Sequence, residues 1–226
     1  NKPIKKEILI VRFELSDCAE VVIVWHADMN DDYCYALRGT KVRKMHSSRR
    51  DAFKAINCEP LAKVWPDKVE FLSQFKARHS GASEIDAVFN DKVALVKFYP
   101  GQSSDIIDYY RMHGFKGLVI EMLGLGHVAA GDSVNSWVPA LKKAIREGMV
   151  ICGACQTIYG RLNPNVYSTG REIEKAGVIF LEDMLSECAF VKLGWVLGHR
   201  GWMSAEKAKE KMLENFSGEL NEFLTE

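Results

Sequence analysis

The sequence has no surplus of charge of either sign and no long apolar run. Its 226 residues include 30 lysines and arginines against 30 aspartates and glutamates. This balance argues against nucleic acid held by overall charge alone, although it leaves room for a local basic patch. No apolar stretch approaches the roughly 20 residues that a membrane-spanning helix needs. The first residues also lack the apolar region and cleavage site of a secretion signal, so we expect a cytoplasmic protein.

The cysteines form no evident framework of disulfide bonds or metal ligands. Six are scattered along a chain long enough to fold without disulfides, which favours reduced thiols. Cys152 and Cys155 have the CxxC spacing of redox and zinc sites. No second CxxC or CxxH completes a set of four zinc ligands. We therefore interpret the pair as the end of a buried strand, and we expect no metal site and no cofactor bound by this chain.

The second part of the chain alternates strands and helices. Hydrophobic residues make up 47% of the sequence, which is typical of a packed globular protein. Strand–helix alternation predicts an α/β fold with a parallel sheet and right-handed crossovers. Residues 169–172 spell a capping box at one helix start. Strands are expected at 93–98, 118–121, 149–154 and 178–181, and helices near 104–114, 136–148, 169–177, 184–197 and 204–216.

The first part of the chain is less regular. Residues 8–13 resemble a strand, but the residues around them match no pattern. Residues 20–25 predict a strand buried on both faces, as in a parallel sheet. Residues 61–75 alternate around Pro66-Asp67, which predicts a β-hairpin. Residues 76–91 are polar and predict a linker. We therefore place a domain boundary between residues 90 and 91.

A basic run lies within this first part. Seven cations occur between Arg38 and Lys54, and Asp51 is the first acidic residue among them. Such a run is most often a solvated face. It is also compatible with a nucleic-acid patch, or with one lysine buried among hydroxyls, where a lowered pKa makes the amine a proton acceptor. Charge and spacing alone do not choose among the three. The cations are Arg38, Lys41, Arg43, Lys44, Arg49, Arg50 and Lys54.

Longer motifs around the run point to a family. The chain resembles the catalytic-lysine segment of the L-asparaginase superfamily at residues 43–48 (RKMHSS) and 51–57 (DAFKAIN). The sequence of these segments is most similar to that of one branch of the superfamily, the D subunits of archaeal Glu-tRNA(Gln) amidotransferases. Several long motifs in one order are more specific than any single short one. The further matches are Asp31–Cys34, Gly124–His127, Tyr159–Arg161, Asn165–Arg171 and Glu182–Met184.

The resemblance implies both a fold and a domain organisation. Residues 1–90 would be a remnant of the N-terminal asparaginase-like α/β domain, including the catalytic-lysine segment and a linker. Residues 91–226 would be the smaller, complete C-terminal α/β domain with its parallel sheet.

The resemblance also implies a role for Lys44, as the lysine of a Thr–Lys–Asp relay. In relatives the threonine nucleophile stands in a Thr-Gly-Gly-Thr turn, and the second threonine and the aspartate form a Thr-Asp pair. Both motifs lie upstream of the lysine segment. This chain has four threonines and neither motif. Because a threonine hydroxyl is a poor nucleophile without its relay, we expect the carboxyl-terminal half of such an enzyme, inactive by itself.

The glycine-rich segment after the second strand is a candidate substrate-binding loop. Backbone N–H groups of Gly124, Gly126 and His127 could approach a substrate carboxylate at the carboxyl end of a strand. The other interpretation is a tight turn whose histidine is held by backbone, and the sequence leaves both open. Leu123 stands where relatives usually have threonine, and Cys155 where a serine is common.

The function implied by the resemblance is release of ammonia from glutamine or asparagine. A partner, the E subunit of the amidotransferase, would use ATP with magnesium to pass the ammonia to glutamate carried by tRNA(Gln). This chain would meet tRNA through that complex and would form a homodimer, as asparaginase-like domains do. The alternatives are a degenerate protein that binds within the complex without catalysis, and a fragment of a cytosolic L-asparaginase.

Overall fold

The structure is a computed structural model that describes residues 16–30, 32–82 and 84–223. The strand-like run at residues 8–13 lies outside these residues. Among those described, the chain divides into two compact units. Unit 1 takes residues up to 84 together with Phe223, and unit 2 takes residues 85–222. No helix in the described part is both long and apolar enough to cross a bilayer.

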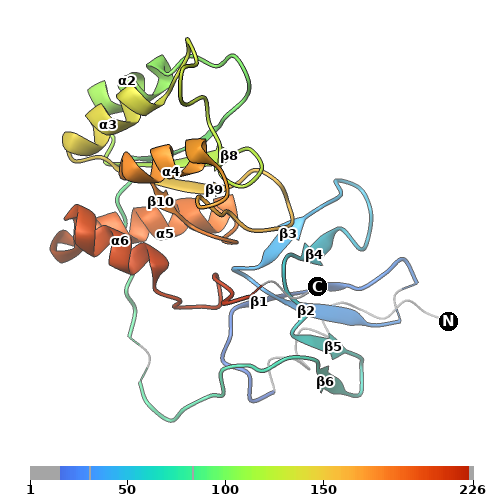
Figure 1. Cartoon of the computed structure of the whole chain (residues 1–226). Coiled ribbons are helices and arrows are strands. Elements are labelled where there is room, and N and C mark those ends of the chain that lie inside the picture. Colours follow the sequence, from blue (N-terminus) through green and yellow to red (C-terminus); the bar gives the residue numbers. More distant parts are fainter. Residues whose placement is uncertain (1–15, 31, 83, 224–226) are drawn as a thin grey trace. The chain divides into compact units, whose positions relative to one another are not determined.

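Unit 1 contains a four-stranded antiparallel sheet in which the strands follow the order β1-β2-β5-β6 (Figure 1). Its core is small and is formed by Val24, Cys34, Ala36, Ala62 and Val64 with their neighbours. The hairpin predicted around Pro66-Asp67 is confirmed as β5 and β6. The strands are β1 Val22–His26, β2 Cys34–Arg38, β5 Ala62–Val64 and β6 Val69–Phe71.

The prediction for β1 is wrong in two respects. The strand exists, but it pairs with β2 in the antiparallel direction and not within a parallel sheet. It is also an edge strand of the described sheet, and Val24 is its one buried residue. An uninterrupted run of β-branched residues indicates that both faces of a strand are apolar. It does not indicate whether the neighbouring strand is parallel or antiparallel.

Unit 2 is a parallel sheet between two layers of helices, which confirms the predicted α/β fold. The strand order is β10-β9-β8-β7, and every pair is parallel. Helices α2, α3 and α4 pack on one face, and α5 and α6 on the other (Figure 1). The strands are β7 Val93–Lys97, β8 Gly117–Met122, β9 Val150–Cys155 and β10 Ile179–Phe180. The helices are α2 Asp105–Met112, α3 Val138–Arg146, α4 Ser168–Lys175, α5 Ser186–Gly198 and α6 Ala205–Leu213, with a 3₁₀ turn at Arg200–Trp202.

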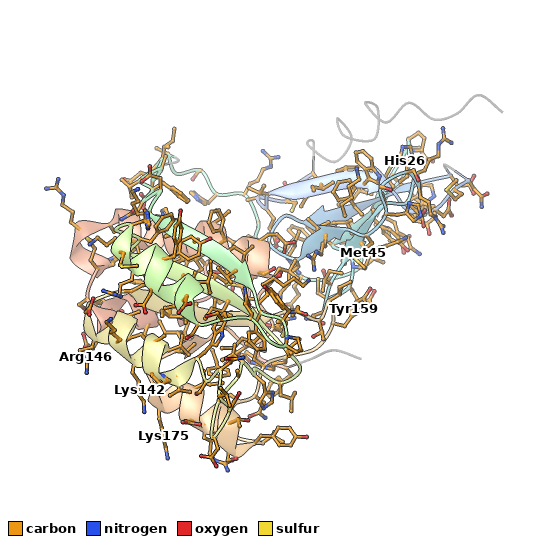
Figure 2. The ribbon with its side chains drawn as sticks, turned by 90° about the horizontal axis from the view of Figure 1, so that it is seen from above. His26, Met45, Lys142, Arg146, Tyr159 and Lys175 are labelled. Carbon is orange, nitrogen blue, oxygen red and sulfur yellow. The ribbon has the colours of Figure 1, made fainter. Side chains whose placement is uncertain are left out.

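Local helix signals agree with the structure at several ends of these elements. Pro139 lies in the first turn of α3, where its missing N–H costs no hydrogen bond. Ser204 caps α6, and its Oγ accepts the Lys207 N–H at 3.2 Å. Cationic side chains of α3 and α4, among them Lys142, Arg146 and Lys175, point away from the sheet (Figure 2). These faces are therefore the solvated sides of the two helices.

The predicted capping box of α4 is wrong. The helix begins at Ser168 with Tyr167 as its N-cap, and no side chain caps it. Thr169 is already inside the helix, and the Glu172 carboxylate accepts the N–H of Gly131 at 2.9 Å instead of bonding back to the helix start. A Cβ on Gly170 would lie 2.8 Å from the carbonyl oxygen of Pro164, so the first turn of this helix packs closely on the preceding loop.

The end of unit 2 is held to α5 by a buried ion pair. Lys192 and Glu219 are 6% and 2% exposed, and Lys192 Nζ lies 2.6 Å from Glu219 Oε1. Glu219 also accepts the N–H groups of Phe216 and Ser217, at 3.2 and 2.6 Å. Burial works against its charge, but these bonds leave the pKa of Glu219 lowered. The pair thereby fixes the segment after α6.

Removing one partner of this pair should make the folded protein less stable. We expect Glu219→Gln to lower the free energy of unfolding by about 3 to 5 kcal/mol, because Lys192 is then left charged and buried. The control is Glu210→Gln, which breaks an exposed pair with Lys207 at 2.6 Å and should leave the free energy of unfolding almost unchanged. Urea unfolding of the two variants compares them, and equal effects would contradict the assignment.

Candidate functional site

Lys44 lies at the end of a short hairpin in unit 1. Strands β3 Val42–Lys44 and β4 Phe53–Ala55 are antiparallel, with Lys44 opposite Phe53. The N–H of Met45, labelled in Figure 2, donates to the carbonyl of Ala52 at 2.7 Å and closes the loop between the strands. The side chain of Lys44 is exposed, and its Nζ lies 5.9 Å from the centre of the Phe53 ring. The hairpin therefore presents Lys44 on a defined backbone but does not enclose it.

The buried lysine of the basic run is Lys41 and not Lys44. Lys41 is 1% exposed. Its N–H donates to Arg38 O at 3.0 Å, and its carbonyl accepts the Ile56 N–H at 2.8 Å. This arrangement ties the start of the hairpin to β2 and to the residue that follows β4.

The remaining cations do not form one continuous solvated face. Arg38 Nε lies 2.6 Å from Glu20 Oε2. Asp51 is buried in the hairpin loop and accepts Arg49 Nε at 2.8 Å and Lys54 Nζ at 3.0 Å. Bonds from Lys54 and then Arg49 lower the pKa of Asp51 to about 2. At least three of the seven charges thus serve to fix the loop and the strand before it.

The glycine-rich loop of unit 2 is a tight turn at the carboxyl end of β8. Leu123 and His127 face each other across it, with N–H to carbonyl bonds of 3.0 and 2.9 Å in the two directions. Gly124 and Gly126 have φ values of 51° and 112°, which disfavour other residues. A Cβ on Gly126 would lie 2.4 Å from the Phe180 ring. The turn interpretation is therefore confirmed for the backbone, while substrate binding by this loop stays a prediction.

The side chain of His127 faces the next loop. Its ring centre lies 5.2 Å from that of Tyr167, at a steep angle. Asn163 N–H donates to Leu125 O at 2.9 Å, so the segment between β9 and α4 packs on the glycine-rich turn. Tyr159 in the same segment extends outward (Figure 2) and is 60% exposed. The two loops therefore pack on each other, and the rings of His127 and Tyr167 meet where they do so.

Both cysteines belong to the buried strand β9, in which Cys152 is an inner residue and Cys155 is the last, so the prediction of a strand is confirmed but only Cys155 ends it. Burial raises the pKa of the Cys152 thiol to about 12, which leaves it unreactive. Cys155 donates to the carbonyl of Glu182 at 3.4 Å. Across the described residues, no three His, Cys, Asp or Glu side chains come together as metal ligands.

Comparison with known proteins decides the family. The family described as Glutaminase/Asparaginase C-terminal domain matches residues 92–212, and the one described as Asparaginase, N-terminal, matches residues 8–77. The chain belongs to the glutaminase/asparaginase family.

Curated relatives are similar over almost all of this asparaginase-family chain. The D subunit of the Glutamyl-tRNA(Gln) amidotransferase of Thermococcus kodakarensis is 48% identical over 96% of the chain, and its counterpart in Pyrococcus abyssi is 50% identical over 96%. In both cases the match takes in 48% of the relative. The chain thus spans about half the length of the curated relatives that it matches.

Solved structures agree on the fold. The thermostable L-asparaginase from Thermococcus kodakarensis superposes with a TM-score of 0.84 at 24% identity, covering 96% of this chain and 62% of that one. L-asparaginase I from Vibrio cholerae superposes with a TM-score of 0.71 at 26% identity, covering 83% and 55%.

A strained residue that no sequence pattern indicates lies at the same edge of the asparaginase-like sheet. Glu182 is a non-glycine residue with φ of 54°, a backbone conformation that non-glycine residues adopt at a cost. Its carbonyl accepts the Leu162 N–H at 3.0 Å, and its carboxylate pairs with Arg161. Arg161 in turn donates to Glu222 O at 2.8 Å. Both residues stood in the motifs of the resemblance, but no local signal marks a positive φ at a glutamate.

The role of the turn glycines is open to a direct test. We expect Gly126→Ala to destabilise the protein by about 3 kcal/mol, because a φ of 112° disfavours alanine and the new methyl group also meets the Phe180 ring. Gly124→Ala adds a methyl group with no atom nearer than 3.9 Å and should cost about 1 kcal/mol, from its φ alone. Chemical unfolding measures both, and equal losses would show that the Phe180 contact is unimportant.

The Asp51 pairs predict a defined pH dependence. The pKa of Asp51 falls from 3.8 to about 2 on folding. Its contribution to stability is therefore complete above about pH 4, and it is lost as the pH falls through about 2. Urea unfolding of the protein and of Asp51→Asn between pH 5 and 2 should give two curves that converge at the acid end. Curves that stay parallel would contradict the pairing.

Proposed function

We propose that this chain is the carboxyl-terminal half of the amidase subunit of a Glu-tRNA(Gln) amidotransferase. The observation that carries the proposal is the 48–50% identity with four archaeal proteins named as the D subunit of that enzyme, over 96% of this chain. In this function the complete amidase hydrolyses glutamine or asparagine and releases ammonia. The ammonia then amidates glutamate on tRNA(Gln), in a reaction for which the partner, the E subunit, uses ATP and magnesium.

Lys44 is the residue of this chain that we assign to the chemistry. Hydrolysis of an amide by a threonine hydroxyl requires a group that takes the hydroxyl proton and later returns it. An amine on a rigid hairpin can serve once it is placed beside that hydroxyl. The Thr-Gly-Gly-Thr and Thr-Asp motifs that supply the hydroxyls and the aspartate are absent from this sequence. The exposed position of Lys44 is consistent with a reaction partner on the part of the amidase that this chain does not span.

Gly124, Gly126 and His127 belong to the proposal as a substrate-binding edge. The turn exposes Gly124, and His127 stands beside the exposed ring of Tyr167. In a homodimer, which we propose as the assembly, this edge would face the reaction centre of the neighbouring protomer. Contact with tRNA(Gln) would come through the complex, in a cytoplasmic and archaeal setting.

A degenerate protein that binds the E subunit without catalysis is the second candidate. Leu123 replaces a threonine in the glycine-rich loop, and Cys155 is engaged with Glu182 O instead of pointing to a substrate. Both departures remove polar groups from the proposed binding edge. A fragment of a cytosolic L-asparaginase is the third candidate. We rank it lower because the curated relatives at 48–50% identity are amidotransferase subunits.

Restoring the missing motifs should restore activity, and Lys44 should be needed for it. We expect the chain alone to release no ammonia from glutamine. A fusion of this chain behind the upstream stretch of the Thermococcus kodakarensis D subunit should release it. In that fusion Lys44→Ala should lower kcat by about 10²- to 10⁴-fold, and Lys68→Ala, an exposed lysine of the same unit, should not change it. Restored activity that survives Lys44→Ala would refute the role of Lys44, and an inactive folded fusion would favour the degenerate protein.

A further inference from the structure

The hairpin that carries Lys44 has a base and a tip, and backbone bonds fix only the base to the neighbouring chain. Lys41 N–H donates to Arg38 O at 3.0 Å, and Ile56 N–H donates to Lys41 O at 2.8 Å. Lys44 lies at the other end of β3, where the loop to β4 begins. We call residues 44–53 the tip of the hairpin. The bonds at the base determine where the hairpin starts, but they do not reach the amine.

One side chain of the four-stranded sheet, that of Trp25, contacts the tip twice. Its ring centre lies 4.8 Å from that of Phe53, at an angle of 62°. Its indole N–H donates to the carbonyl of Arg50 in the loop. Phe53 is the cross-strand partner of Lys44, and Lys44 Nζ lies 5.9 Å from the centre of the Phe53 ring. Trp25 therefore contacts both the residue opposite the amine and the loop that follows the amine.

The alternation of side chains along β1 explains why Trp25 reaches the hairpin. Val22 and Val24 pack on the core of unit 1, so Trp25 points to the opposite face of the sheet. It is half-buried there, and its contact with Phe53 places the tip over this face. Because β3 and β4 form a two-stranded sheet of their own, this is a side-chain contact between two sheets.

The ion pairs of the loop have a different effect. Asp51 binds Arg49 and Lys54, at 2.8 and 3.0 Å, and all three residues belong to the hairpin. These pairs make the loop itself more rigid, whereas the contacts of Trp25 hold the loop relative to the sheet. A lysine amine is carried on a long and flexible stem, so a fixed backbone is the first requirement for placing it.

We propose that Trp25 is the positioning residue for Lys44 in amide hydrolysis. The inference rests on the proposed function for the role of Lys44. Trp25 acts without touching the substrate, by holding the tip through Phe53 and through the carbonyl of Arg50. A misplacement of about 1 Å can lower the rate of a reaction about 100-fold. A loosened tip should therefore slow the chemical step and leave the binding of the substrate unchanged.

Hydrogen exchange of the chain itself tests the anchoring of the tip apart from activity. Trp25→Phe keeps an aromatic ring and removes the N–H that binds Arg50 O. We expect the Met45 amide, which donates to Ala52 O within the tip, to exchange about fivefold faster, as for the loss of one hydrogen bond. The Ile56 amide at the base should not change. Unchanged exchange at Met45, or equal acceleration at Met45 and Ile56, would overturn the proposal.

Trp65→Phe is the matched control for this experiment. Trp65 is a half-buried tryptophan of the same unit, and its ring stacks on that of Tyr33, with centres 5.2 Å apart. The control makes the same chemical change at the end of β5 and should leave the Met45 amide unchanged. If it accelerates exchange at Met45 as much as Trp25→Phe does, the effect is one of general stability and the proposal fails.

The fusion that carries the upstream stretch tests the consequence for catalysis. In the fusion, Trp25→Phe should lower kcat about tenfold at an unchanged KM, and Trp65→Phe should change neither. Urea unfolding of each variant shows that the compared enzymes are folded. An unchanged kcat in the Trp25→Phe fusion, or a raised KM at the same kcat, would overturn the proposal. If the parent fusion is folded but inactive, the proposed function fails, while selective acceleration at Met45 still supports Trp25 as the anchor of the tip.

Discussion

The two-sided burial of β8 is the constraint on which unit 2 depends. All six residues of β8 are buried, and they alternate between two separate cores, with Leu118 and Ile120 on one side and Val119 on the other. Both helical layers are thereby fixed to one strand. The chain can leave such a strand only at its end, and there it turns within four residues, at Gly124 and Gly126. Because the Phe180 ring occupies the space beside Gly126, the same packing also fixes the shape of the candidate binding loop.

The parts of this fold that follow from local patterns could be predicted from the sequence. The four strands of unit 2, the helices between them and the hairpin at Pro66-Asp67 all have periodic or turn signals, and the structure contains them. The capping box of α4 failed because Glu172 bonds to Gly131, a residue 41 positions away. The positive φ of Glu182 has no local signal either, since it depends on the loop that Arg161 and Leu162 bring against it.

The basic run shows the same limit at the candidate site. Resemblance selects Lys44, and spacing allows any lysine of the run to be buried. The lysine that is buried is Lys41, whose backbone bonds to Arg38 of β2 and to Ile56 after β4. Asp51 and Glu20 take up other cations of the run. The sequence gives the positions of the charges, but the environments of Arg38 and Lys41 depend on Glu20 and Ile56, which lie outside the run.

The edge strand and the exposed lysine of unit 1 are connected through one side chain. Trp25 of β1 packs on Phe53 of β4, with ring centres 4.8 Å apart, and its indole N–H donates to the carbonyl of Arg50 in the hairpin loop. Phe53 is the residue opposite Lys44. Trp25 therefore restricts the hairpin that presents the amine. A relay needs its groups held within a fraction of an ångström, so the proposed role of Lys44 depends on the packing of Trp25 against Phe53.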